Sequence, residues 1–256
     1  MAPIVYLPHG AGPLPLLGDP SQKALAEFLT HLPHTLGNPT AILVISAHWE
    51  EKHPTLTGAN VPGLIYDYYG FEPRAYTINY EAKGSLALTK RVQECLHVKN
   101  IEAHIDTKRG YDHGVFVPLK LMYPETTVPI VQLSLVASFS PLVHIRMGEA
   151  LRALRDEGVL ILGSGLSFHN MRAYGLPTAQ GVAFDAWLQE TLVSNDYEGT
   201  KQKLIAWESA PEARFAHPRE EHLLPLHVCF GASTKGAKVV FDALFMGTKV
   251  SAFLWE

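Results

Sequence analysis

The sequence is poor in cysteine, and it has no block of basic residues and no long apolar run. Its two cysteines, Cys95 and Cys229, lie far apart in apolar stretches, which indicates buried thiols in a reducing compartment rather than a disulfide framework. With 21 Lys and Arg against 25 Asp and Glu, the net charge is −4, so we expect no nucleic acid partner. The N-terminal MAPIVYLPHGAGPL has no basic region before its short apolar run, which predicts neither signal peptide nor membrane span and favours a cytoplasmic protein.

Composition is otherwise that of an ordinary globular protein. The chain has 256 residues, of which 47% are hydrophobic and 18% charged, and this balance predicts one domain over residues 1–256. Histidine is the outlier, because its 13 copies are about twice what average usage would give. The places of these histidines therefore indicate the function better than composition does.

Short apolar runs bounded by Gly, Pro or Ser alternate with stretches of helical spacing. The runs predict buried strands at Pro3–Leu7, Ala41–Ser46, Val128–Ser134, Val159–Gly163 and Lys238–Phe241. The helical spacing predicts helices at Gln22–Leu32, Ser85–Leu96, Leu142–Leu154, Ala183–Val193 and in the segment after Pro218. This alternation favours the α/β class, as a single three-layer α/β/α domain with a central, mostly parallel (mixed) sheet.

Three histidines follow predicted strands. His9 comes after IVYLP, His48 after AILVIS, and His169 a few residues after VLILGSG. Ligands of open parallel sheets bind just beyond the carboxyl ends of the strands, so these three side chains are expected to converge on one mouth of the sheet.

Two further histidines are expected at the same mouth. His113 lies in the loop-like run RGYDHG, and His222 lies one turn beyond Pro218 in the predicted helix. A lone histidine is more often structural than a ligand, but five that converge favour a metal or catalytic site. His217 suits either a neighbour of the helix cap or a pocket wall. The other histidines are expected to be structural or solvated: His31, His34, His53, His97, His104, His144 and His227.

Imidazole ligands suit iron and zinc alike, and a site of two or three histidines leaves coordination positions open for catalysis. A structural zinc site would instead bring cysteines and closely spaced ligand pairs, which this sequence lacks. The histidine pattern therefore predicts one catalytic divalent metal at the carboxyl ends of the strands.

The segment Thr57–Tyr80 is long and aromatic, without a clear period, and includes YDYYGF at Tyr66–Phe71. Connections of this length in a compact domain are usually lids or binding loops. A surface hairpin with ordinary aromatic packing is the alternative.

Six ordered motifs extend over nearly the whole chain: HG at His9, SAHWE around His48, YDYYGF at Tyr66–Phe71, DHGVFVPL from Asp112, GSGLSFHN ending at Asn170, and HPREEHLLPLHV from His217. Together they resemble the LigB-like class III extradiol ring-cleavage dioxygenases, in the DOPA 4,5-dioxygenase branch. The resemblance implies an oxidoreductase in which a catechol chelates Fe(II) and O2 cleaves its ring beside the hydroxyl pair.

The same resemblance implies roles for the five histidines. His9, His48 and His222 match the metal ligands of the family. His169 matches a catalytic acid/base that can also close on the metal as a fourth ligand, and His113 matches a catalytic second-sphere residue.

Substrate binding is expected to fall to Tyr66, Tyr68, Tyr69 and His217. The implied partners are a small DOPA-like catechol and O2, with no nucleic acid or membrane, for a chain that is a monomer or a homodimer. The implied cofactor is one divalent metal, Fe(II) for activity, with Zn(II) as the alternative ion.

Several alternatives remain open on sequence alone. Protocatechuate-type relatives use two histidines and a glutamate, so Glu220 and Glu221 compete with His222 as the third ligand. A zinc-binding, hydrolase-like enzyme has the same kind of ligands. A non-catalytic metal-binding interaction protein is the third interpretation, because fold alone does not define function.

Overall fold

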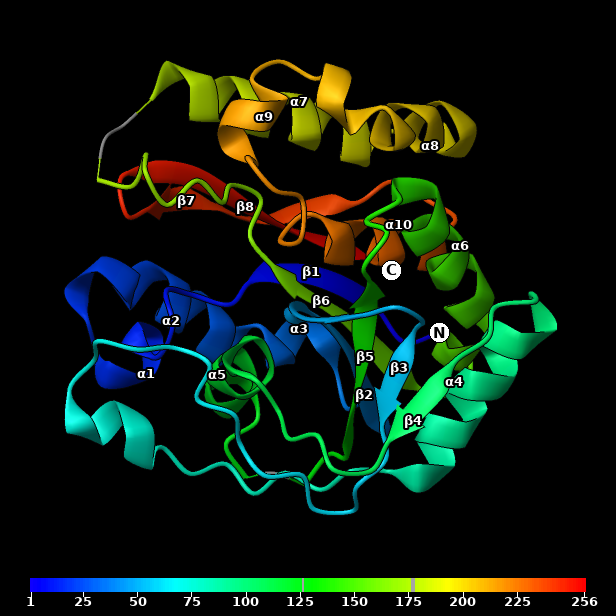
Figure 1. Ribbon diagram of the computed structural model, residues 1–256. Coiled ribbons are helices and arrows are strands. Elements are labelled where there is room, and N and C mark those ends of the chain that lie inside the picture. The colour runs from blue at the N-terminus through cyan, green and yellow to red at the C-terminus, as the bar shows by residue number, and fades with distance from the viewer. Residues whose placement is uncertain (126, 176–177) are drawn as a thin grey trace.

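The computed structural model describes residues 1–125, 127–175 and 178–256. Its centre is an eight-stranded sheet with the strand order β4-β3-β5-β2-β6-β1-β8-β7 (Figure 1). The strands are β1 (Ile4–Pro8), β2 (Ala41–Glu51), β3 (Thr55–Thr57), β4 (His104–Asp106), β5 (Ile130–Val136), β6 (Val159–Gly165), β7 (Lys238–Phe245) and β8 (Thr248–Trp255).

The middle of the sheet is parallel, and both of its faces are covered. Strands β5, β2, β6 and β1 pair in parallel and are almost wholly buried, as expected for continuous Val, Ile and Leu runs. Strands β3 and β5, β1 and β8, and β7 and β8 pair antiparallel, so the sheet is mixed. The α/β class and the mixed sheet predicted from the sequence are confirmed.

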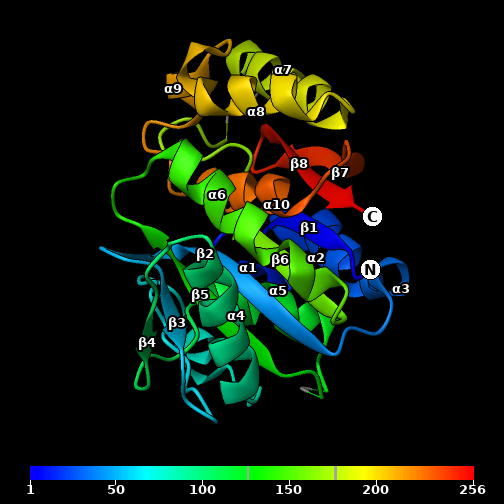
Figure 2. The same ribbon diagram turned by 90° about the vertical axis from the view of Figure 1, so that its right-hand side faces the viewer.

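Helices form a layer on each face. They are α1 (Leu14–Leu17), α2 (Lys23–His31), α3 (Pro33–Leu36), α4 (Leu86–Val98), α5 (His113–Met122), α6 (Pro141–Leu151), α7 (Ala179–Val193), α8 (Tyr197–Ile205), α9 (Ala213–Ala216) and α10 (Leu224–Ala232). Helices α6 and α10 pack on one face of the sheet, and α5 with α2 on the other (Figure 1). Helices α7, α8 and α9 gather above the hairpin of β7 and β8 (Figure 2).

The five predicted strands are all present, and two of them run on well past their predicted ends. The short strands β3 and β4 and the last strand, β8, were not predicted. Three-residue strands carry too little pattern to be recognised, and β8 follows the turn at Met246 and Gly247 too closely to stand out as a separate run.

Two local predictions are wrong. His113 is the first residue of α5, with Asp112 at its N-cap position, rather than part of a loop. His222 precedes α10, which begins at Leu224, rather than lying within a helix opened by Pro218. In both cases the histidine stands just outside or at the very start of a helix.

Both cysteines are buried free thiols, as predicted. Among the described residues, each helix is too short or too polar to span a lipid bilayer.

Candidate metal centre

Three elements bring histidines to the carboxyl ends of the central strands. His9 directly follows β1, and His48 lies in β2 where the register with β5 shifts between Ile45 and Glu50. Such a bulge turns a side chain away from the regular alternation of the strand. His222 is held next to β1, because its carbonyl oxygen accepts a hydrogen bond from Tyr6 Oη at 2.8 Å.

The rings of His9, His48 and His222 lie close to one another. Their centroids are 4.8 Å apart for His9 and His48, 5.2 Å for His9 and His222, and 5.0 Å for His48 and His222. Three imidazoles that bind one ion at about 2.1 Å would have centroids about 5 Å apart. The nearly equal spacing therefore fits a shared ion.

Each of these three rings has a separate oxygen atom near its Nδ1. Nδ1 of His9 lies 2.9 Å from Gly10 O, and Nδ1 of His222 lies 2.8 Å from Glu221 Oε1. Nδ1 of His48 lies 3.5 Å from Asp67 Oδ2. A proton held on Nδ1 leaves the lone pair on Nε2, which is the arrangement of metal-binding histidines.

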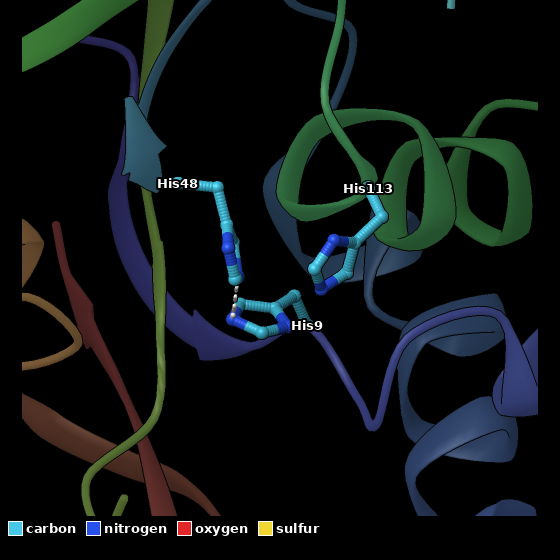
Figure 3. Close-up of side chains that lie close together, drawn as sticks. All are labelled: His9, His48 and His113. Atoms are coloured by element: carbon cyan, nitrogen blue, oxygen red, sulfur yellow. Dashed lines mark hydrogen bonds between the residues drawn. The ribbon is translucent and has the colours of Figure 1, made fainter. Parts of the chain in front are cut away.

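The three Nε2 atoms have no satisfactory protein partner. Nε2 of His222 is buried without a hydrogen bond. Nε2 of His9 and Nε2 of His48 face each other at 3.2 Å (Figure 3), and with both protons on Nδ1 this contact joins two lone pairs. A buried polar atom without a partner is costly, and a cation between these atoms would remove that cost. The donor set thus fits a divalent metal.

Electrostatics keep these rings neutral. Burial lowers the pKa of His9, His48 and His222 well below the usual value, and the positive charge that neighbouring histidines would carry lowers it further. Because only a neutral imidazole offers a lone pair, the three rings are ready to bind metal near pH 7.

Asp67 joins the pair His48 and His113. Its Oδ1 accepts hydrogen bonds from the backbone N and from Nδ1 of His113, both at 2.9 Å. Burial works to raise the pKa of Asp67, but the hydrogen bonds from His113 and the nearby His48 outweigh it and the pKa lies below its usual value. The rings of His113 and His48 are 4.0 Å apart, and both point toward His9 (Figure 3).

Glu221 joins a second pair in the same way. Its Oε1 lies 2.8 Å from Nδ1 of His222 and 3.1 Å from Nδ1 of His169. The rings of His169 and His222 stack with centroids 3.4 Å apart. Asp67 therefore contacts His48 and His113, and Glu221 contacts His222 and His169.

Asp67 and Glu221 had not been assigned these roles from the sequence. Asp67 lies in YDYYGF, where its aromatic neighbours drew attention to stacking, and Glu221 was considered only as a rival ligand to His222. A carboxylate next to a candidate histidine, or in a loop rich in site residues, is the available signal for such an acceptor.

Close backbone contacts hold the cluster together. A Cβ on Gly114 would stand 2.5 Å from Ser46 Oγ and 3.1 Å from His48 Cδ2, so only glycine lets the start of α5 approach β2. Asp112 is fully buried and accepts hydrogen bonds from Ser46 Oγ at 2.7 Å and from Gln132 Nε2. These contacts fix His113 relative to His48.

A cavity of about 360 Å³ opens beside the five histidines of the cluster. Tyr68 and Tyr69 line it, together with Phe71, Leu166 and Tyr174. Tyr68 donates its hydroxyl to Ala75 O at 2.6 Å, whereas Tyr69 is 92% exposed at the rim. The cavity has the size and the aromatic wall that a small ring compound requires.

The structure separates two other residues expected to bind substrate from this cavity. Tyr66 donates its hydroxyl to Ile78 O at 2.8 Å and packs against Phe116. His217 is fully buried between Phe184 and Trp207, with Nε2 2.9 Å from Ser167 O. Neither residue lines the cavity.

Fold and site together are those of an α/β protein with a candidate metal centre at the carboxyl ends of its strands. Residues 6–249 match the family model described as the catalytic LigB subunit of aromatic ring-opening dioxygenase. The chain belongs to this family.

Curated relatives agree with this family. A protein named dioxygenase tasH from Hapsidospora irregularis is 40% identical, with 100% of this chain and 86% of the relative covered. A 4,5-DOPA dioxygenase extradiol from Beta vulgaris is 39% identical over 91% of this chain and 87% of its own. Another protein of that name from Escherichia coli (strain K12) is 33% identical over 90% of this chain and 84% of its own.

A solved structure has the same fold. The crystal structure of an uncharacterized protein from Escherichia coli K12 superposes over 100% of both chains with a TM-score of 0.82 and 28% sequence identity. The chain is thus an extradiol, aromatic ring-opening dioxygenase that acts on a small aromatic substrate with O2. This class replaces the two other interpretations of the sequence, a zinc hydrolase and a non-catalytic binding protein.

Proposed function

We propose that the chain cleaves the ring of a small catechol of the size of DOPA, with one Fe(II) held by His9, His48 and His222. The observation that carries the proposal is the clustering of three imidazole rings, those of His9, His48 and His222, beside an aromatic cavity. When bound, Fe(II) would make the catechol hydroxyls more acidic and supply the redox chemistry that O2 requires. Names of relatives such as 4,5-DOPA dioxygenase extradiol support a catechol.

His222 is proposed as the third ligand in preference to Glu221. Nε2 of His222 is buried without a hydrogen bond. Oε2 of Glu221 also has no hydrogen bond, but it lies 3.8 Å from Arg219 Nη1, and Oε1 of the same carboxylate lies close to two imidazoles. Glu221 would then orient His222 and increase the basicity of its ring, as carboxylates behind metal-bound histidines do.

His169 and His113 are proposed as the groups that move protons. Both hold Nδ1 on a carboxylate, His169 on Glu221 and His113 on Asp67, which leaves Nε2 free to accept a proton from a catechol hydroxyl. Their rings line the same cavity as Tyr68. His169 has a 21% exposed side chain and can move more freely than the buried His113.

The cavity wall supplies binding energy for the ring. Tyr68 and Phe71 are 5.5 Å apart at a steep angle, and Tyr68 lies 5.7 Å from His113. A planar ring next to these edges gains apolar contact while its two hydroxyls face the histidines. Positioning of this kind is a major part of the rate that a binding site can supply.

The test is to load the protein anaerobically with Fe(II), or with Zn(II) as a control, and to add a panel of small catechols that includes DOPA. The expected result is a yellow semialdehyde product with one O2 consumed per ring cleaved by the iron form alone. Metal analysis of the protein as isolated would identify the ion that it carries. If no catechol in the panel were cleaved by fully iron-loaded protein, the proposal would be wrong.

A further inference from the structure

The cavity is asymmetric in charge. Apart from the histidines, its wall is built from aromatic and thioether side chains, among them Tyr68, Phe71, Met171, Tyr174 and Met246. The charged side chain in this wall is Asp67, an anion. None of the described residues that line the cavity is Lys or Arg.

Two arginines lie in a neighbouring hollow. Arg109 and Arg219 line a separate hollow of about 420 Å³, which shares His48 and His222 with the cavity. His48 and His222 therefore line both spaces, whereas Arg109 and Arg219 line the hollow and not the cavity.

Both arginines are also already paired. Arg219 holds both oxygens of Glu50, at 2.7 and 2.6 Å. Arg109 Nη2 donates to His48 O at 3.2 Å and to Asp112 Oδ2 at 3.3 Å, and the guanidinium lies 4.4 Å from the Trp49 ring. A substrate carboxylate would have to break these contacts to gain a cation.

A carboxylate on the ring substituent would therefore meet no Lys or Arg among the described residues that line the cavity, and the charge of the metal would be offset by the catechol oxygens. Asp67 stands in the cavity wall, and Glu221 lies behind His169 and His222. Placing another anion in a partly enclosed space beside these groups loses hydration and adds repulsion. An ammonium group would instead be attracted to Asp67 and to the faces of Tyr69 and Tyr174.

We propose that this cavity selects catechols by the charge of the ring substituent, accepting neutral or cationic substituents and discriminating against a carboxylate. The inference rests on the proposed catechol cleavage and deepens it. L-DOPA and dopamine are a matched pair, because they share the ring and the ammonium and differ only in the carboxylate. 3,4-Dihydroxyphenylacetate and 4-methylcatechol form a second pair without an ammonium.

Two readouts separate this proposal from the proposed function. With iron-loaded protein, kcat/KM is expected to be about tenfold or more higher for dopamine than for L-DOPA, and for 4-methylcatechol than for the phenylacetate. With zinc-loaded protein, which has no redox chemistry, calorimetry should give the same order of binding affinities. The binding experiment decides the charge preference even if no catechol is turned over.

A variant tests whether the absence of a cationic side chain from the cavity wall causes this preference. Met171 is 70% exposed on the cavity wall, so replacement should leave the fold intact. Met171→Arg is expected to reduce the preference for dopamine over L-DOPA by about tenfold, since a guanidinium can pair with the carboxylate. Met171→Gln, of similar length but neutral, should leave the ratio within about threefold of the parent.

Three results would overturn the proposal. One is equal or better binding of L-DOPA and of the phenylacetate by the zinc-loaded parent protein. Another is an absence of binding by either member of both pairs. The third is an equal change in preference for Met171→Arg and Met171→Gln, which would assign the effect to shape rather than charge.

Discussion

Buried histidines occupy two regions of this molecule, and their hydrogen bonds differ. In the layer of α6 and α10, His144 places Nδ1 2.8 Å from Ser140 O, and its Nε2 accepts from Val136 N at 3.1 Å. At the mouth of the sheet, His222 has Nδ1 on Glu221 but no partner for Nε2. Burial and a lowered pKa are common to both regions. The free nitrogen distinguishes the candidate ligand from the structural ring.

A free nitrogen alone is still insufficient. Nδ1 of His217 is also buried without a hydrogen bond, yet this ring lies between Phe184 and Trp207. What His217 lacks is a second nitrogen that faces the same point, as the Nε2 atoms of His9 and His48 do. Convergence of free nitrogens is therefore the criterion, and it can be tested by substitution in each region.

The largest expected effect comes from replacing a candidate ligand and a structural histidine that lie close together in the sequence. His222→Ala should reduce bound metal from about one ion per chain to about a tenth or less and abolish turnover, because two remaining imidazoles hold an ion weakly. His227→Ala should keep the metal and lower the free energy of unfolding by about 2–4 kcal/mol. His227 is fully buried, with Nδ1 3.2 Å from Leu223 O and Nε2 3.0 Å from Leu204 O.

Metal analysis and urea unfolding of the two variants check this contrast. If His227→Ala lost the metal while His222→Ala retained it, the criterion of a free converging nitrogen would be wrong.

His169 should have the next largest effect, on turnover rather than on metal. His169→Ala is expected to lower kcat by about 10²–10⁴-fold, the usual contribution of a positioned acid or base, while metal content stays near that of the parent. Single-turnover kinetics and metal analysis on the same sample measure both. Loss of the metal together with full activity after reconstitution would make His169 a plain ligand.

The sequence predicted the central layer and the identity of the clustered histidines because both depend on local patterns. Continuous apolar runs define strands that are buried on both faces, and the carboxyl ends of parallel strands must share one edge. His9 and His48 followed from this rule alone. The partners of these rings depend on contacts between distant segments, such as Asp67 with His113, and no local pattern encodes them.

The same limit explains the misplaced helix around His222. Pro218 is an adequate signal for a first helical turn, but α10 begins at Leu224, with Pro225 in its own first turn. The Tyr66–Phe71 segment shows the reverse case. All three of its tyrosines were expected to bind substrate. In the structure Tyr66 packs against Phe116, whereas Tyr68 lines the cavity.

Replacement of Asp67 should have an intermediate effect on metal affinity or turnover. Asp67→Asn keeps the shape but weakens the acceptor for His48 and His113, so metal affinity or kcat should fall by about 10–100-fold. Competition with a chelator measures the affinity, and steady-state kinetics measure kcat. Glu72→Gln is the control in the same loop, since Glu72 pairs with Arg74 on the surface. Equal behaviour of both variants would remove Asp67 from the site.

The buried structural histidine His144 should make the stability of the protein depend on pH. Burial lowers the pKa of His144 from its ordinary value of 6.5 to about 4. Between these two values the unfolded chain binds a proton that the folded chain does not, so stability falls as pH decreases, by up to about 1.4 kcal/mol per pH unit. His144→Gln should reduce that slope by a comparable amount in urea unfolding of metal-free protein between pH 6.5 and 4. The exposed His34→Gln variant is the control, and an identical slope in both would contradict the assignment.

The smallest expected effect separates the two ends of the aromatic segment. Tyr69 is 92% exposed at the rim of the cavity, whereas Tyr66 is half-buried and donates its hydroxyl to Ile78 O. Tyr69→Ala should raise KM for a catechol about 2–5-fold and leave the unfolding free energy within about 0.5 kcal/mol, because little packing is lost. Tyr66→Ala should instead cost about 1–3 kcal/mol through its lost contacts and hydrogen bond. If Tyr69→Ala left KM and substrate preference unchanged, the rim would be surface alone, and substrate contact would be confined to the deeper wall around Tyr68.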